Sequence, residues 1–151
     1  SSITYKHSKN FINHWKTNYN MAEFKFVIND VKTGKTFQKA LEDESVIGKK
    51  IGEKLNGGFL GLEGYELEIK GGSDSAGFPM KSNINSSQRR KLLLSRGTAM
   101  RKNRAGLKIR KTVCGNTISS NITQINLKVI KYGAKSLEDI FAPKEEAPKA
   151  E

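Results

Sequence analysis

The chain has 151 residues, of which 36% are hydrophobic, and its formal net charge is +12 at pH 7. This length predicts one domain with a buried core and is too short for two. The sequence has neither the roughly 18 consecutive apolar residues of a membrane helix nor the apolar centre of a secretory signal, so we expect a soluble cytoplasmic protein with no membrane partner.

The first 20 residues are distinct from the rest of the chain. They precede a Met-Ala pair, Met21 and Ala22, that resembles a natural start. We interpret residues 1–20 as a leader that is either non-native or disordered, and we assign no function to its two histidines.

Alternating hydrophobic residues predict short β-strands after the leader. Phe24, Phe26 and Ile28 alternate with polar neighbours, and a second run, TFQKAL, follows a turn at residues 30–35. This pattern predicts a strand-turn-strand hairpin. Residues 45–62 are ambiguous, because their apolar residues have helical spacing whereas their glycines favour short strands and tight turns. We favour strands.

Three later runs also alternate: Tyr65 to Ile69, LKIRKTV at 107–113 and ITQINLKVIK at 122–131. In LKIRKTV one side would pack inward while Lys108 and Arg110 point outward, which predicts a strand with one basic face.

The last element that the sequence predicts is one helical turn, SLEDIF, which begins at a possible capping box formed by Ser136 and Asp139. Residues 142–151 are expected to form a disordered acidic tail. Short strands between glycine-rich turns predict a mainly β fold, with residues 21–141 forming a small closed barrel with one or two brief helices and an extended basic loop.

Groups suited to catalysis are scarce. No histidine follows the leader, and the single cysteine, Cys114, permits neither an internal disulfide nor a C-x-x-C zinc site. The run GGFLGLEG matches neither a dinucleotide fingerprint nor a phosphate loop. We predict no enzymatic activity, no metal, no cofactor and no small-molecule substrate. An enzyme that holds a phosphate ligand at Gly71 to Asp74 is an alternative, which a thermal shift with nucleotide or metal would detect.

The most charged stretch of the chain is RRKLLLSRGTAMRKNRAGLKIRK, residues 89–111, which has ten Lys or Arg and no acid. It lies within residues 75–137, where fourteen cations occur without one Asp or Glu. Because cations neutralise phosphates and release condensed counterions, this segment predicts a polyanionic partner.

The kind of polyanion follows from a missing residue type. Residues 79–131 contain no Phe, Tyr or Trp, whereas proteins that bind single strands commonly stack bases on aromatic rings. We therefore expect folded RNA, recognised through phosphates, shape and the 2′-hydroxyl. DNA is possible on charge alone, although the sequence has no DNA-binding motif. The predicted RNA-binding residues are Lys81, Arg89, Arg90, Lys91, Arg96, Arg101, Lys102, Arg104, Lys108, Arg110 and Lys111.

Three motifs carry a family resemblance: GGSDSAGFPMK at 71–81, LLLSRG at 92–97 and RKTVCGNTISSNITQINLKVI at 110–130. With them the chain resembles, from about residue 21 to residue 141, the small-subunit ribosomal protein S-six family of the archaeal and eukaryotic type, in its short archaeal form. The resemblance implies a β-rich barrel bound to 16S-type rRNA beside neighbouring ribosomal proteins, with no catalytic role. It also implies a structural signature loop made of Gly71, Gly72, Asp74, Gly77, Phe78, Pro79 and Met80.

The favoured interpretation is a structural constituent of the small ribosomal subunit, which binds folded rRNA through its basic segment and supports translation. The alternative is a free-standing RNA chaperone or regulatory RNA-binding protein that uses the same surface. It predicts fast exchange and no fixed place in the particle.

Overall fold

The computed structural model describes residues 23–102 and 104–142. The leader predicted over residues 1–20, and all of the predicted tail except Ala142, lie outside the described residues. The described elements, in chain order, are β1 (Glu23–Asn29), β2 (Thr36–Glu42), η2 (Glu44–Val46), β3 (Lys54–Asn56), η3 (Gly57–Leu60), β4 (Glu66–Asp74), β5 (Arg89–Leu94), β6 (Ile109–Cys114), β7 (Ile122–Lys131) and α1 (Leu137–Phe141), where η marks a 3₁₀ helix.

The strands form two sheets. The larger has the order β2-β1-β7-β4-β3, with β1 and β7 parallel and the other neighbours antiparallel. The smaller contains β5 and β6, which are antiparallel. The prediction of a mainly β chain with brief helices is therefore confirmed.

The closed barrel predicted from the sequence is wrong. Closure requires the two outer strands to pair with each other, but within the described ranges β2 and β3 remain the open edges of the five-stranded sheet. The reason is local, because β3 has only three residues and the chain then turns into η3. A side-chain hydrogen bond joins β2 to the segment that follows β3, because Lys39 of β2 donates from Nζ to the carbonyl oxygen of Leu60 in η3 at 2.7 Å.

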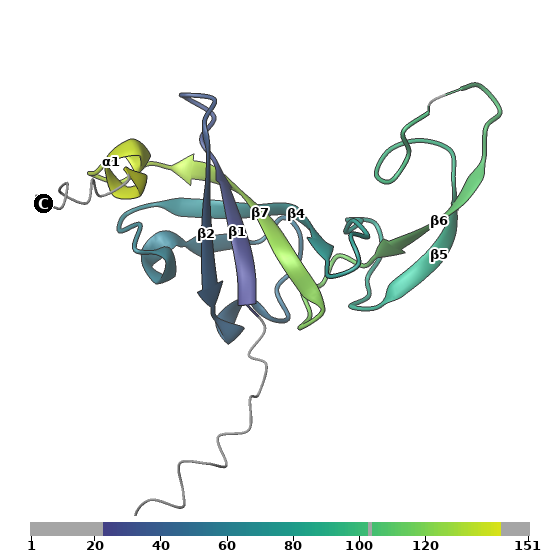
Figure 1. Cartoon of the computed structure of the whole chain (residues 1–151), viewed down its shortest axis with the longest axis horizontal. Helices are drawn as coiled ribbons and strands as arrows, with labels where there is room; N and C mark the ends of the chain where they lie inside the picture. The colour runs from purple at the N-terminus through teal and green to yellow at the C-terminus, as the bar shows by residue number, and fades with distance from the viewer. Residues whose placement is uncertain (1–22, 103, 143–151) are drawn as a thin grey trace, which may run out of the picture.

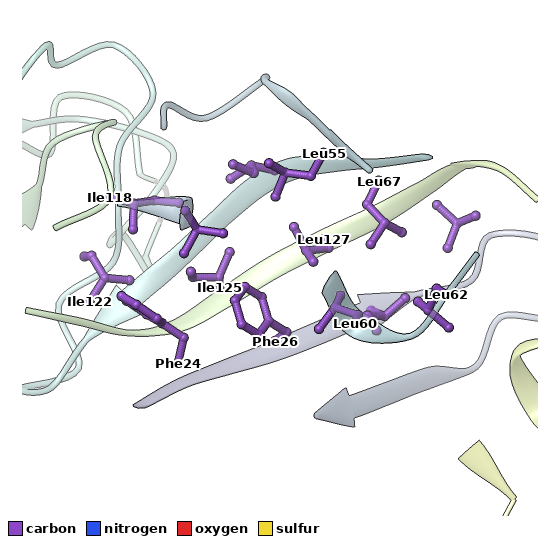
Figure 2. Close-up of a cluster of buried hydrophobic side chains, with 14 of the residues drawn as sticks. Phe24, Phe26, Leu55, Leu60, Leu62, Leu67, Ile118, Ile122, Ile125 and Leu127 are labelled. Atoms are coloured by element: carbon purple, nitrogen blue, oxygen red, sulfur yellow. The ribbon is translucent and has the colours of Figure 1, made fainter. Parts of the chain in front are cut away.

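The hydrophobic core lies on one side of the five-stranded sheet. Figure 2 shows Phe24 and Phe26 of β1, Leu67 of β4, and Ile125 and Leu127 of β7 gathered there, and all five are fully buried. Alternation in β1, β4 and β7 places these residues on one face, as their period of two predicts. The short strand β3 adds Leu55 to the core, and the connections between strands supply further core residues, which include Val46, Leu60, Leu62 and Ile118.

The ambiguous region 45–62 contains one strand of three residues between two 3₁₀ helices. The preference for strands holds only for the three residues Lys54–Asn56, because most of the region forms turns and 3₁₀ helices. Gly52 and Gly61 adopt φ values of +95° and +78°, which L-residues with side chains rarely adopt. The glycines thus shape this region more than the helical spacing of its apolar residues does.

The β5–β6 sheet stands apart from the rest of the molecule. In Figure 1 it extends beyond one end of the five-stranded sheet, whereas α1 lies at the opposite end. We call residues 89–114 the basic hairpin. Its base joins the larger sheet through residues 72–81, because Cys114 donates from its backbone N–H to the carbonyl of Pro79 at 2.8 Å and Met80 donates to Gly72 at 2.9 Å.

Candidate nucleic-acid interface

The basic hairpin is a two-stranded ladder that ends in a long loop. Six residue pairs, from Arg89 opposite Cys114 to Leu94 opposite Ile109, hold β5 and β6 together. Residues 95–108 connect the two strands, and two short turns in this connection are closed by backbone hydrogen bonds from Met100 to Gly97 and from Leu107 to Arg104, both at 3.1 Å.

The predicted RNA-binding residues gather on this hairpin. All ten cations between residues 89 and 111 are exposed, and Lys81, at the base, is half-buried. Only Arg89 among these eleven forms an ion pair with an acidic side chain in the part of the chain that the structure describes. The remaining cations therefore carry their charge into solvent.

The register of β5 and β6 distributes these cations over both faces of the hairpin. Residues that lie opposite each other point to the same side, and successive residues point to opposite sides. We define the Lys91 face as Arg89, Lys91, Leu93, Arg110, Thr112 and Cys114, and the Arg90 face as Arg90, Leu92, Leu94, Ile109, Lys111 and Val113. In β6, Arg110 points away from Ile109 and Val113, as the alternation predicts, but Lys111 lies on the same side as these two apolar residues, so the hairpin has cations on both faces and not on one alone.

A buried carboxylate fixes the base of the Lys91 face. The side chain of Asp74 is fully buried, and its Oδ2 accepts hydrogen bonds from Arg89 Nε at 2.5 Å and from Cys114 Sγ at 3.2 Å. Its Oδ1 accepts from the backbone N–H groups of Ala76 and Phe78, both at 2.9 Å. Asp74 therefore ties the end of β4 to the start of β5 and the end of β6.

Burial of the Asp74 carboxylate opposes its ionisation. The hydrogen bonds from Cys114, Arg89, Phe78 and Ala76 outweigh burial and hold the pKa of Asp74 below its ordinary value of 3.8. At Cys114, burial and the hydrogen bond to Asp74 raise the pKa of the thiol to about 11. Cys114 is therefore a neutral donor at physiological pH and is not an activated nucleophile.

The signature loop wraps around this carboxylate. Gly72 leaves room for β7, because a Cβ at Gly72 would lie 2.3 Å from the carbonyl oxygen of Gln124. Gly77 turns the loop with a φ of +85°, and Met80 is buried in the core. The centre of the Phe78 ring lies 5.2 Å from the guanidinium carbon of Arg89. Both oxygens of Asp74 already accept donors from the chain, which disfavours the alternative of a phosphate ligand held at Gly71 to Asp74.

The pairing of Arg89 with Asp74 was not predicted from the sequence. The available signal was that Asp74 is the last acid before the acid-free stretch, so it is the counter-charge nearest to the hairpin along the chain. Asn116 was not predicted either, although its side-chain nitrogen donates to Asn85 Oδ1 at 2.8 Å and holds residues 82–86 against the end of β6.

The described part of the chain offers neither a metal site nor a membrane-spanning helix. No group of three His, Cys, Asp or Glu side chains comes together there as a metal site. No helix in residues 23–102 or 104–142 is both long and apolar enough to cross a membrane.

Comparison with known proteins extends these observations. The family model described as Ribosomal protein S6e matches residues 24–142. The small ribosomal subunit protein eS6 of Methanocaldococcus jannaschii is 47% identical over 121 residues, which cover 80% of this chain and 92% of that protein. The protein of the same name from Archaeoglobus fulgidus is 46% identical over 128 residues, which cover 82% and 99%. The chain therefore belongs to the ribosomal protein S6e family, a family of structural proteins and not of enzymes.

Proposed function

We propose that this chain is a structural constituent of the small ribosomal subunit and binds folded 16S-type rRNA through the basic hairpin and Lys81. The observation that carries the proposal is the exposure of ten cations on a projecting hairpin that contains no acid. The relatives, each named small ribosomal subunit protein eS6, support the place in the particle. Its partners would be the rRNA and neighbouring ribosomal proteins.

The electrostatics of the hairpin suit a phosphate backbone. A protein that neutralises about 6–10 phosphates loses roughly 10³- to 10⁵-fold in affinity between 50 and 200 mM salt, and the hairpin carries enough exposed cations for that number of contacts. The described part of residues 79–131 has no aromatic ring on which a base could stack, so duplex or junction RNA is a better partner than a single strand.

We also propose that the signature loop is structural. Its contacts, centred on Asp74, join the hairpin to the core. Arg89 then has two functions, because its Nε is held by Asp74 while its side chain remains 44% exposed and can still face a phosphate.

The test removes the loop cations without touching the ladder. The four-residue variant Arg96→Gln, Arg101→Gln, Lys102→Gln and Arg104→Gln should weaken binding to a small-subunit rRNA transcript and reduce co-sedimentation with small subunits at 100 mM salt. A matched variant on the sheet body and its C-terminal connection changes the same charge and should bind normally: Lys25→Gln, Lys50→Gln, Lys54→Gln and Lys135→Gln.

Two results would contradict the proposal. Equal losses in both variants would show that only total charge matters. A native protein that is found outside ribosomes and exchanges rapidly with them would favour the free-standing RNA chaperone or regulator instead.

A further inference from the structure

We propose that the basic hairpin is held between two separate phosphate surfaces of folded RNA, one on each of its faces. This inference rests on the proposed function and adds the shape of the partner, which is a junction or a groove with two walls. A hairpin that merely lay on one RNA helix would need cations on one face only.

The two faces of the hairpin point in opposite directions. Successive side chains of a strand point to opposite sides of the sheet, so Arg90 and Lys91 leave β5 in opposite directions. The pairing of Leu92 with Lys111 and of Leu93 with Arg110 repeats this division on β6. A single flat RNA surface that touches Lys91 and Arg110 is therefore out of reach of Arg90 and Lys111.

Each face of the hairpin presents a compact pair of cations. On the Lys91 face, Lys91 lies diagonal to Arg110, and on the Arg90 face, Arg90 lies diagonal to Lys111. Such diagonal neighbours are about 7–8 Å apart. All four side chains are exposed, and no acid of the described chain pairs with any of them. Each face thus has an equal and unopposed positive charge.

Apolar side chains lie beside each pair of cations. On the Lys91 face Leu93 is 59% exposed next to Arg110, and a large apolar side chain in that position favours a partner close enough to remove it from water. On the Arg90 face Val113 and Leu94 are buried by the chain itself, whereas Arg90 and Lys111 are exposed. Both faces therefore present exposed cations, and the Lys91 face adds an exposed apolar side chain.

The experiment compares two variants that change the same number of charges and the same residue types. Lys91→Gln with Arg110→Gln neutralises the Lys91 face, and Arg90→Gln with Lys111→Gln neutralises the Arg90 face. The control is Lys25→Gln with Lys54→Gln on the larger sheet. Affinity for a small-subunit rRNA transcript is measured at several salt concentrations, and thermal melts establish that each variant is folded.

The expected result is that both face variants reduce the slope of log affinity against log salt by about 1.8, from about 0.9 for each lost phosphate contact, while the control leaves it unchanged. A reduction for one face only would overturn the two-surface inference and leave the proposed function intact. No reduction for either face would overturn this inference, and the proposed function would then depend on the loop variant alone.

A second measurement locates the two surfaces. A cleavage reagent is attached at Leu92→Cys on the Arg90 face or at Thr112→Cys on the Lys91 face, and the native Cys114 is buried and should not react. Each position should cut a different segment of the rRNA. Cuts in one shared segment would overturn the inference. So would face variants that bind naked rRNA normally but fail to enter small subunits, because the second surface would then be a protein.

Discussion

At the base of the hairpin, Asp74 receives four hydrogen bonds from three segments of the chain. A buried carboxylate is favourable only when its charge is compensated in this way. Because the pKa of Asp74 is lower in the folded chain than its ordinary value of 3.8, ionisation stabilises the fold at neutral pH. That contribution is lost as the pH falls below about 3.8 toward the folded pKa.

The variant Asp74→Asn should therefore lower the free energy of unfolding by about 1–3 kcal/mol at pH 7, because a charged hydrogen-bond acceptor for Arg89 is removed. At pH 3 the difference from the unmodified chain should be smaller, since Asp74 of the unfolded chain is then largely protonated and ionisation of the folded carboxylate adds less stability. Urea denaturation at pH 7 and pH 3 measures both values. A difference that stays constant between these pH values would show that the charge of Asp74 does not contribute.

Gly71 and Gly72 provide a matched pair of positions on β4. A Cβ at Gly72 would meet the backbone carbonyl of Gln124 at 2.3 Å, whereas at Gly71 no atom lies within 4 Å. Gly72→Ala should therefore separate β4 from β7 and cost about 1–3 kcal/mol of stability.

Gly71→Ala is the control, and its stability should be unchanged or raised by up to about 1 kcal/mol through the lost freedom of the unfolded chain. Thermal melts of the two variants decide the matter. Equal destabilisation would show that glycine is needed for flexibility in this strand and not for the close approach of β7.

The strands illustrate what hydrophobic alternation can predict. The period of two in β1, β4 and β7 identified both the strands and their buried faces, because one face of an amphipathic strand must pack on a core. Alternation does not say whether two edge strands pair, so the barrel closure was predicted wrongly. It also does not give the register between β5 and β6, and only that register shows that Lys111 and Arg90 share a face.

The loop of the basic hairpin should be the most mobile of its parts in the absence of RNA. Residues 95–108 carry five cations that repel one another, and two backbone hydrogen bonds close turns within them. Ala99 has a φ of +74°, an uncommon conformation for a residue with a side chain. Among the residues of this loop that the structure describes, few contacts thus oppose local opening.

Hydrogen exchange on the free protein measures this mobility. Amides in the loop should exchange much faster than those paired between β5 and β6, and the latter faster than those of the central strand β7. Bound rRNA should slow the exchange of the loop. Uniformly strong protection across residues 89–106 in the free protein would contradict the prediction.

On the scale of the whole molecule, the hydrophobic core and the exposed cations of the basic hairpin lie in different parts of the chain. The core is built from residues outside the 95–108 connection, and the exposed cations of the hairpin lie beyond the end of the five-stranded sheet (Figure 1). Composition along the chain was enough to locate the candidate site, because an acid-free stretch is visible without any structure. Its attachment through Asp74 was not visible, because that contact joins residues 15 positions apart through a side chain.

This separation predicts that the loop can be removed without unfolding the sheet. Replacing residues 96–107 by Asn-Gly would continue the pairing of Leu94 with Ile109 into a two-residue turn of the kind that hairpins favour. The melting temperature should change by less than about 4 °C, which corresponds to roughly 1 kcal/mol for a domain of this size.

Because four cations are lost, the salt slope of rRNA binding should fall by about 3.6. The four-glutamine loop variant is the control, and it should lose the same slope if charge alone is responsible. A larger loss on shortening would mean that the loop backbone also contacts RNA, and a large fall in melting temperature would mean that the loop supports the fold.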